Sequence, residues 1–583
     1  MAKTRKVTPA ESQEHERLLG HDPFEGLDTE WLNREEGALS IEVLGHDPFE
    51  DMDLDWMEEG KASTGLQWES MTGGTVPITL PSAAKEAAEE AARCSLGQII
   101  VEQPGVTPPQ TAAPAIATPQ PTPEQPTRPA LRAPAVPITH PRPEATFHFP
   151  ADFKWGVATA AHQVEGDNVN SDWWAWEQEP GRIKEGHTSG LACDWWRNAE
   201  ADLDRAAAMG LNALRLSVEW SRIEPRPGVF DEQALARYAR ILQGLRERGI
   251  EPMVTLHHFS NPRWLAERGG WEATETISLF ARFVRRVVES LGRYCNLWCT
   301  INEPNVYAFF GYLEGKFPPG KSDFKAALRV MRNMLRGHAA AYRQIHAVQT
   351  DARVGFAHHM RVLDPLNPHS LLDRRVARNA DTIFNQAILS ALVSGVWKPP
   401  LGFGLAPGLR RTLDWIGLNY YTRDTVTFDR SQAQAMFTRR QRSEGAELLD
   451  GGYGEFYPHG IFRCIRRLAR LELPIYITEN GIPDSDDDQR PRYILTHLHQ
   501  VWRAIQLCDP VMGYYHWTLV DNFEWAEGWT LRFGLIELDP ATQRRRPRPS
   551  ASLYADVVRA NAITPQIIDT YAPELRSELL PVW

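Results

Sequence analysis

The chain has 583 residues, of which 42% are hydrophobic and 24% charged, an ordinary composition for a globular protein. Its net charge of −12 disfavours general binding to nucleic acid or to an anionic membrane. No apolar segment follows the basic N-terminus and no apolar run reaches membrane-spanning length, so we expect no signal peptide, no transmembrane helix and a cytoplasmic location. The six cysteines are scattered without a C-x-x-C pair, which favours buried free thiols in a reducing compartment.

The N-terminal part of the chain differs from the rest. Residues 1–103 are acidic, and we expect them to form a disordered arm. Within this arm the heptapeptide LGHDPFE, from Leu19 to Glu25, recurs unchanged from Leu44 to Glu50. Residues 104–146 are rich in proline, interleaved with threonine, alanine and glutamine, which predicts an extended, semi-rigid linker.

The repeated heptapeptide has two interpretations. Two copies are too few for a solenoid, but two apolar-aromatic motifs in an acidic arm are typical of short docking motifs that become ordered on a protein partner. The alternative is a solubilising arm with a chance duplication. The motif lacks the alternating acids and glycine of a calcium loop, so we expect no metal there.

From Phe147 onward, apolar strand patterns alternate with amphipathic helix patterns. Such alternation predicts βαβ units and a parallel sheet, and eight units over this length favour an α/β fold of the (β/α)8 TIM barrel type for residues 147–565, followed by a C-terminal tail at 566–583. No G-x-G-x-x-G follows the first strand, which weakens a dinucleotide site, and we expect no cofactor. The expected strands are 154–159, 213–219, 252–258, 297–302, 353–359, 415–421, 475–479 and 512–518. The clearest helices are expected at 199–209, 231–248, 274–294, 324–348 and 491–508.

Two of the expected strands end in an acid beside an asparagine. Glu303 follows the fourth strand and Glu479 ends the seventh. The carboxyl ends of all strands of a parallel barrel meet at one rim, so the two side chains should face each other across its mouth. Two carboxyl groups that flank one site suit cleavage of a glycosidic bond, with retention or inversion decided by their separation.

The motifs around these acids resemble known signatures. Residues 300–304 (TINEP) and 477–481 (ITENG) are similar to the two signatures of glycoside hydrolase family 1, which comprises retaining β-glucosidases and β-galactosidases. Five further stretches resemble the family in its order, so that the resemblance covers about residues 147 to 562. They are FKWGVATAAHQVEG at 153–166, RLSVEWSR at 215–222, TLHHF at 255–259, GLNYY at 417–421 and DNFEW at 521–525.

The resemblance implies a role for each acid. Glu303 would be the acid/base and Glu479 the nucleophile. We expect burial and the charge of Glu479 to raise the pKa of Glu303, while Glu479 stays ionised. Arg215 and the hydroxyl of Tyr421 would support the charge of Glu479, and Asn302 would bind the 2-hydroxyl of the sugar.

The same resemblance implies a sugar pocket. Gln163, His258, Glu524 and Trp525 would bind hydroxyl groups, and the indole of Trp517 would carry the sugar ring. A negative Glu524 would repel a 6-phosphate, which predicts unphosphorylated substrates.

Other features leave alternatives open. His358 and His359, at the end of the fifth strand, either contact the aglycone or are structural. Asp484–Asp488 is predicted to be a solvated acidic loop, with a loose cation site as the alternative. Residues 430–451 show little strand pattern. Four tryptophans either form a sugar-stacking surface or belong to the core, and we expect about half of them in the core: Trp173, Trp174, Trp195 and Trp196.

These observations predict a retaining exo-β-glycosidase that acts on unphosphorylated β-glucosides or β-galactosides. One alternative is a transglycosylase on the same scaffold. A second is a non-catalytic sugar-binding protein docked through its N-terminal repeats, against which the presence of both glutamates argues.

Overall fold

The computed structural model of the protein describes residues 145–432 and 435–580. The predicted acidic arm, both LGHDPFE repeats and almost all of the proline-rich linker lie outside these residues.

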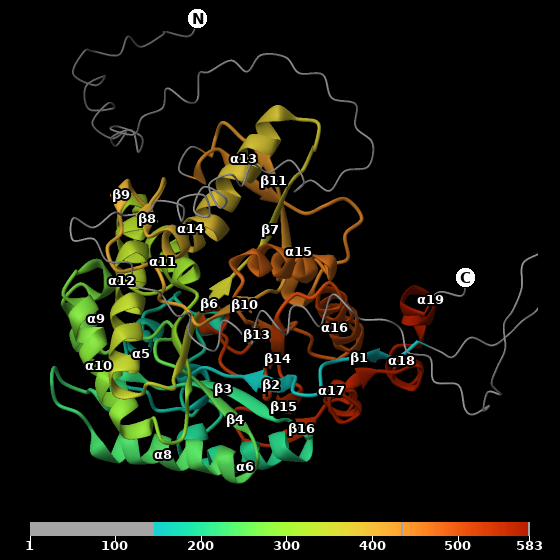
Figure 1. Ribbon diagram of the computed structural model, residues 1–583, viewed down its shortest axis with the longest axis horizontal. Coiled ribbons are helices and arrows are strands. Elements are labelled where there is room, and N and C mark those ends of the chain that lie inside the picture. The colour runs from blue at the N-terminus through green and yellow to red at the C-terminus, as the bar shows by residue number, and fades with distance from the viewer. Residues whose placement is uncertain (1–144, 433–434, 581–583) are drawn as a thin grey trace, which may run out of the picture. The chain divides into compact units, whose positions relative to one another are not determined.

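A closed barrel of eight parallel strands forms the centre of the fold, as the sequence predicts (Figure 1). The circle closes where the last strand pairs with the first, with Trp517 opposite Ala158. Each strand is almost wholly buried, because helices cover its outer side and neighbouring side chains fill the barrel. In chain order the barrel strands are β2 (Lys154–Ala158), β3 (Ala213–Ser217), β4 (Glu251–Thr255), β5 (Leu297–Asn302), β6 (Arg353–His359), β10 (Trp415–Asn419), β13 (Ile475–Asn480) and β14 (Val511–Trp517).

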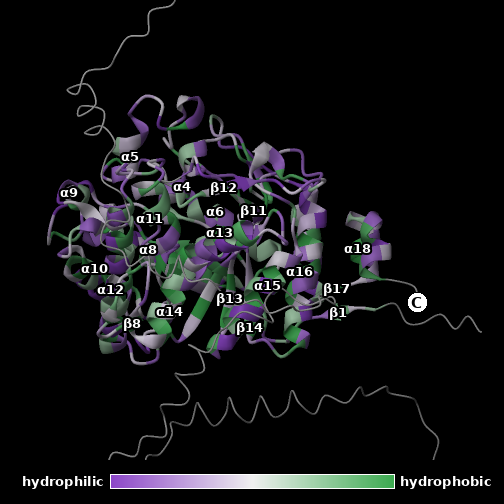
Figure 2. Ribbon diagram, turned by 90° about the horizontal axis from the view of Figure 1, so that it is seen from above, coloured by the Kyte–Doolittle hydropathy of each residue, from purple (hydrophilic) through white to green (hydrophobic). Residues whose placement is uncertain are grey.

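Amphipathic helices surround the strands, and the five predicted helices are present with ends shifted by a few residues. Figure 2 shows hydrophobic residues gathered around β13 and β14 and hydrophilic residues on the outer loops. Within the described part of the chain, no helix is both long enough and apolar enough to cross a membrane. The main helices are α6 (Trp195–Ala208), α8 (Glu232–Glu247), α10 (Thr276–Leu291), α12 (Phe324–Val348), α15 (His459–Leu468), α16 (Arg490–Gln506) and α17 (Pro549–Ala560).

A second, three-stranded sheet extends two of the barrel strands beyond the rim. Strand β7 (Val362–Pro365) directly follows β6, and β11 (Arg423–Phe428) follows β10 and pairs with β7 in parallel. Strand β12 (Thr438–Gln441) adds an antiparallel edge. It lies in the segment where the sequence shows little strand pattern, because an exposed edge strand needs no apolar alternation. Helix α13 (Leu371–Asp381) packs on this sheet through a small apolar cluster, above the barrel in Figure 1.

The two ends of the folded region are joined to each other. Strand β1 (Phe147–His148) pairs with β17 (Ala562–Ile563) in antiparallel fashion. The predicted C-terminal tail is helical as far as the structure describes it. Its helices are α18 (Pro565–Tyr571) and α19 (Arg576–Leu579), and Ile568 of α18 is fully buried.

Candidate active site

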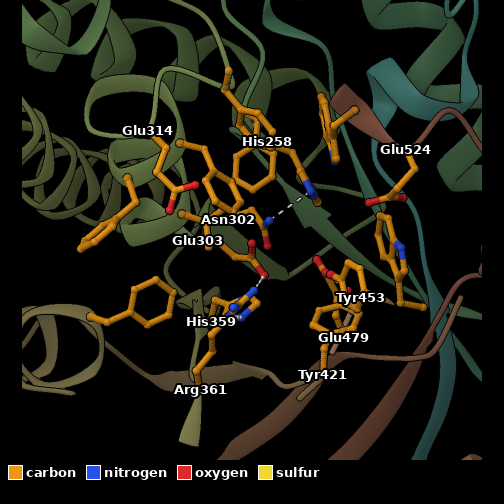
Figure 3. Close-up of a pocket in the computed structure, with 18 of the residues that line it drawn as sticks. His258, Asn302, Glu303, Glu314, His359, Arg361, Tyr421, Tyr453, Glu479 and Glu524 are labelled. Atoms are coloured by element: carbon orange, nitrogen blue, oxygen red, sulfur yellow. Dashed lines mark hydrogen bonds and ion pairs between the residues drawn. The ribbon is translucent and has the colours of Figure 1, made fainter. Parts of the chain in front are cut away.

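Glu303 and Glu479 line one pocket at the carboxyl ends of the barrel strands (Figure 3). Both are buried, with 5% and 3% of their surface exposed. Glu303 follows β5 and caps helix α11 (Pro304–Tyr312) with a φ of 44°, in the left-handed region. A non-glycine residue there is strained, and such residues are concentrated at functional sites.

Each carboxylate oxygen of Glu479 has a close donor. Arg215, fully buried on β3, donates from Nη1 to Oε1 at 2.5 Å, and the hydroxyl of Tyr421 donates to Oε2 at 2.6 Å. Charge-assisted bonds on both oxygens stabilise the carboxylate anion and fix its orientation. Two residues further on, a Cβ at Gly481 would lie 1.9 Å from the carbonyl oxygen of Trp517, so only glycine fits where β13 leaves the barrel.

Two asparagines connect the acids. Asn302 accepts from Arg215 Nη2 at 2.6 Å, and its amide Nδ2 lies 3.0 Å from His258 Nε2. Asn419, the last residue of β10, donates from Nδ2 to Glu303 Oε1 at 2.7 Å and to Asn302 Oδ1 at 3.1 Å. Asn419 is not among the predicted site residues, although it lies inside the GLNYY motif at 417–421. Its position at the end of an expected barrel strand is the sequence feature that could have indicated a role in the site.

His359 is the second neighbour of Glu303. Its Nδ1 lies 3.0 Å from Glu303 Oε1, and its Nε2 accepts from Arg361 Nε at 3.3 Å. His358 faces away, with Nε2 at 2.8 Å from the backbone carbonyl of Asn385. The structure therefore divides the histidine pair: His358 is structural, and His359 contacts the predicted acid/base as well as lining the pocket.

The protonation of the two acids depends on His359. Burial raises the pKa of Glu479 to about 7, and the charge of Glu303 adds to this rise while Arg215 and Tyr421 oppose it. Burial also raises the pKa of Glu303, but a charged His359, with the hydrogen bonds from His359 and Asn419, lowers that pKa below its ordinary value. A charged His359 thus reverses the pKa order predicted for the pair. The sequence does not reveal this dependence, because it does not place a histidine at Glu303.

One side of the pocket holds polar and aromatic groups that the sequence predicts to bind sugar. Gln163 donates from Nε2 to Glu524 Oε2 at 3.0 Å. The ring of His258 stacks between Trp517 and Trp525, with ring centroids 6.0 and 5.9 Å away. His258 Nδ1 belongs to a ring that lines the pocket and has no hydrogen-bond partner among the described residues, so it can bind a sugar hydroxyl. Gln163 Oε1 also has no such partner, but this residue lies behind the pocket lining.

The opposite wall of the pocket is apolar, and none of its residues is among those predicted from the sequence. Helix α11 begins directly after Glu303, so its side chains form the wall next to that acid. The run of apolar and aromatic residues that follows Glu303 in the sequence could have indicated this wall. The apolar side chains that line this pocket include Val306, Phe309, Phe310, Phe317 and Phe384.

Most predicted site residues meet in this pocket. Arg215 and Gln163 are absent from its lining and act from behind it, through Glu479 and Glu524. The four tryptophans at the entrance side do not line the pocket, and Trp173 packs under it against Trp525.

The predicted solvated loop at 484–488 is wrong in part. Asp484 is fully buried and accepts backbone N–H bonds from Asp487, Gln489 and Arg490. Asp487 is also buried and accepts from the hydroxyl of Ser550. These two acids fix the turn before α16, a role that a run of aspartates does not reveal.

The chemistry of the pocket defines the class of protein. One acid can protonate a leaving oxygen while a second carboxylate, held by Arg215 and Tyr421, attacks the carbon, which is what cleavage of a glycosidic bond requires. The chain is therefore a glycoside hydrolase built on a (β/α)8 barrel. It belongs to glycosyl hydrolase family 1, whose model matches residues 145–401 and 405–563. The resemblance seen in the sequence is confirmed.

The relatives match about seven-tenths of this chain and nearly their own whole length. The chain is 33% identical over 446 residues to β-glucosidase A of Thermotoga maritima, covering 71% of this chain and 98% of that protein. It is 31% identical over 504 residues to a β-galactosidase of Pyrococcus woesei, covering 72% and 98%. The solved β-glycosidase from Pyrococcus horikoshii superposes with a TM-score of 0.69 at 35% identity, covering 73% and 98%.

Proposed function

We propose that the protein is a retaining exo-β-glycosidase that removes a terminal, unphosphorylated β-glucosyl or β-galactosyl group. The observation that carries the proposal is the pairing of Glu479 with Arg215 and Tyr421 in the pocket that also holds Glu303. Relatives named β-glucosidase and β-galactosidase support both sugars.

The reaction proceeds in two displacements. Glu303 donates a proton to the glycosidic oxygen while Glu479 attacks the anomeric carbon and forms a glycosyl ester. Ester formation removes the charge of Glu479, so the pKa of Glu303 falls at the second step and Glu303 takes a proton from the attacking water. Asn302, fixed by Arg215 and by His258, is placed to bind the 2-hydroxyl.

Rejection of a 6-phosphate follows from the acids of the pocket. Burial raises the pKa of Glu524 to about 8, with the charges of Glu479 and Glu303 adding to the rise. Glu524 is therefore mostly neutral at pH 7, and the repulsion predicted from its charge alone is weaker than the sequence implies. A phosphate dianion would still be buried beside three acidic groups, which is unfavourable without a paired cation.

A substrate panel tests the proposal. We expect the purified protein to release nitrophenol from the β-glucoside and the β-galactoside, with kcat/KM for the β-glucoside 6-phosphate lower by at least about 100-fold, since an unpaired buried charge costs several kcal/mol. The α-glucoside is the control and should not react. If correctly folded protein turns over no β-glycoside, the proposed activity is wrong. If the 6-phosphate is the best substrate, the assignment of substrate class is wrong.

Neither alternative function gains support. A non-catalytic sugar-binding protein does not need two carboxylates and a buried arginine in one pocket. A transglycosylase would share this chemistry, and product analysis with an added alcohol acceptor separates it from a hydrolase.

We also propose a cytoplasmic location and a protein partner for the arm. None of the five cysteines in the described residues forms a disulfide, which fits a reducing compartment. Of these cysteines, Cys508 is exposed and the rest are buried, so the expectation of buried thiols is wrong at that position.

Deletion of residues 1–140 is expected to leave kcat and KM for the nitrophenyl glucoside unchanged within about two-fold. The reason is that the described site is built wholly from residues of the barrel. The same deletion should abolish capture of a partner, and capture should also fail when Phe24 and Phe49 are both changed to alanine in the full chain. A large loss of turnover on deletion would contradict the linker interpretation.

A further inference from the structure

His359 lies between the predicted acid/base and a half-buried arginine, Arg361. Its Nδ1 is 3.0 Å from Glu303 Oε1, and Arg361 Nε donates to its Nε2 at 3.3 Å. In Figure 3 Glu303, His359 and Arg361 follow one another along one side of the pocket.

The arginine determines the tautomer of the imidazole. A guanidinium has donors only and keeps its proton in proteins. The nitrogen that accepts from Arg361 must therefore carry a lone pair, which leaves the single proton of a neutral imidazole on Nδ1. His359 then donates from Nδ1 to Glu303 Oε1.

The small sheet outside the barrel holds the arginine in place. Arg361 lies between β6 and β7, and its Nη1 donates to Asp424 Oδ2 on β11 at 2.8 Å. Arg440 on β12 and Arg442 just after it each lie 3.9 Å from a carboxylate oxygen of Asp424. Asp424 is buried, with 5% of its surface exposed, and surrounding cations keep its pKa below the ordinary value although burial raises it. Asp424 therefore stays ionised and orients the guanidinium.

The other groups around His359 supply no second proton. Tyr421 stacks on the imidazole, with centroids 5.8 Å apart and an angle of 22°, and Phe384 packs edge-on at 5.7 Å. Burial raises the pKa of Tyr421 well above its ordinary value, so the phenol is neutral. The charged or titratable neighbours are Glu303, Tyr421 and Arg361, with His358 beside His359 on β6.

Glu303 Oε1 thus accepts two hydrogen bonds, one from His359 and one from Asn419 Nδ2 at 2.7 Å. An oxygen that accepts from two donors is a poor place for an acidic proton. We propose that Asp424, Arg361 and His359 form a positioning relay, which holds His359 neutral with its proton on Nδ1 and directs the catalytic proton of Glu303 to Oε2. This inference deepens the proposed function and rests on it.

In the first displacement the relay keeps a proton on Glu303 that can be transferred to the leaving oxygen. The C1–O bond breaks with its electron pair going to the leaving oxygen, and that oxygen takes the proton from Oε2. A neutral imidazole does not lower the pKa of Glu303 by charge, so the proton stays on Glu303 until it is needed. With Glu303 neutral, its repulsion no longer acts on Glu479, which Arg215 and Tyr421 then keep ionised.

Neutron crystallography of the unchanged protein near pH 6 tests the relay without any assay of activity. We expect deuterium on His359 Nδ1, none on Nε2, and a deuterium on Oε2 of Glu303. Deuterium on Nε2, or on Glu303 Oε1, would overturn the proposal. Turnover of 2,4-dinitrophenyl β-glucoside by the same preparation tests the proposed function separately, since that leaving group needs no proton.

Arg361→Met provides a test in solution. Without the guanidinium, Nε2 can take a proton, and the imidazolium lowers the pKa of Glu303. The alkaline limb of kcat/KM for an alkyl β-glucoside should therefore move down by about one pH unit or more. Hydrolysis of the dinitrophenyl glucoside should change less than about three-fold. Arg439→Met is the matched control, because Arg439 is an exposed arginine of the same small sheet that pairs with Asp429 and not with Asp424.

A double variant makes this test decisive. In Arg361→Met/His359→Asn the asparagine amide can still donate to Glu303 but cannot become charged, so the alkaline limb should return to the position of the unchanged enzyme. If the alkaline limb stays shifted in the double variant, the proposed relay is wrong. The relay is also wrong if Arg361→Met lowers kcat/KM equally for the alkyl and the dinitrophenyl glucoside and does not shift the limb. Thermal unfolding and circular dichroism show whether each variant is folded.

Discussion

Replacement of Glu479 by glycine is expected to lower kcat for nitrophenyl β-glucoside by roughly 10⁴ to 10⁶, the range seen when the nucleophile of a covalent mechanism is removed. The loss is large because no other carboxylate in the described pocket has an arginine on one oxygen and a tyrosine hydroxyl on the other. Steady-state rates with purified protein, over several days of incubation if needed, give the measurement. Glu479→Gln, which keeps the side-chain volume, should lose activity to a similar extent.

Azide distinguishes loss of the nucleophile from loss of folding. In Glu479→Gly the anion can occupy the space beside Arg215 and attack C1 from the face opposite the leaving group. We expect recovery of dinitrophenyl β-glucoside cleavage with an α-glucosyl azide as product, identified by NMR. Glu537→Gln, at an exposed glutamate of β15 (Ile536–Leu538), is the control and should be fully active. A β-glucosyl azide, or more than about 1% residual activity without azide, would rule out Glu479 as nucleophile.

The barrel could be predicted because its strands carry a strong sequence signal. Strands buried on both faces are continuous apolar runs, and β5 and β13 end in an acid beside an asparagine. The two acids can then be assigned to the same rim without further information, since a parallel barrel brings the carboxyl ends of all its strands to one rim. Glu303 and Glu479 could be paired in this way before any distance was known.

Contacts that depend on register could not be predicted. His358 and His359 are adjacent, and only the pairing of β6 with β5 and β10 decides which of them faces Glu303. The pKa order of the two acids was predicted without His359 and was therefore incomplete. Strand β12 and Asp424, which fix Arg361 from a distance in sequence, leave no pattern that points to Glu303.

Replacement of Glu303 by alanine is the second change with a large expected effect, and its size should depend on the leaving group. For alkyl β-glucosides, kcat/KM should fall by roughly 10² to 10⁴, the usual contribution of a positioned general acid. For 2,4-dinitrophenyl β-glucoside, kcat/KM should fall by less than about ten-fold, because dinitrophenolate leaves without a proton. The alkaline limb of the pH profile should disappear, since the group that titrates there has been removed.

The second displacement, measured in Glu303→Ala, tests the acid/base role of Glu303 independently. Water lacks its general base in Glu303→Ala, so the glycosyl ester on Glu479 should accumulate and produce a burst of dinitrophenol followed by slow turnover. Azide needs no base and should restore turnover with a β-glucosyl azide, the opposite anomer to that from Glu479→Gly. Two variants of one pocket that give azides of opposite configuration can be explained only if the two carboxylates act on opposite faces of the sugar. An equal loss for both leaving groups, or an α-azide from Glu303→Ala, would exclude the acid/base role and remove the basis for a proton directed to Oε2 by His359.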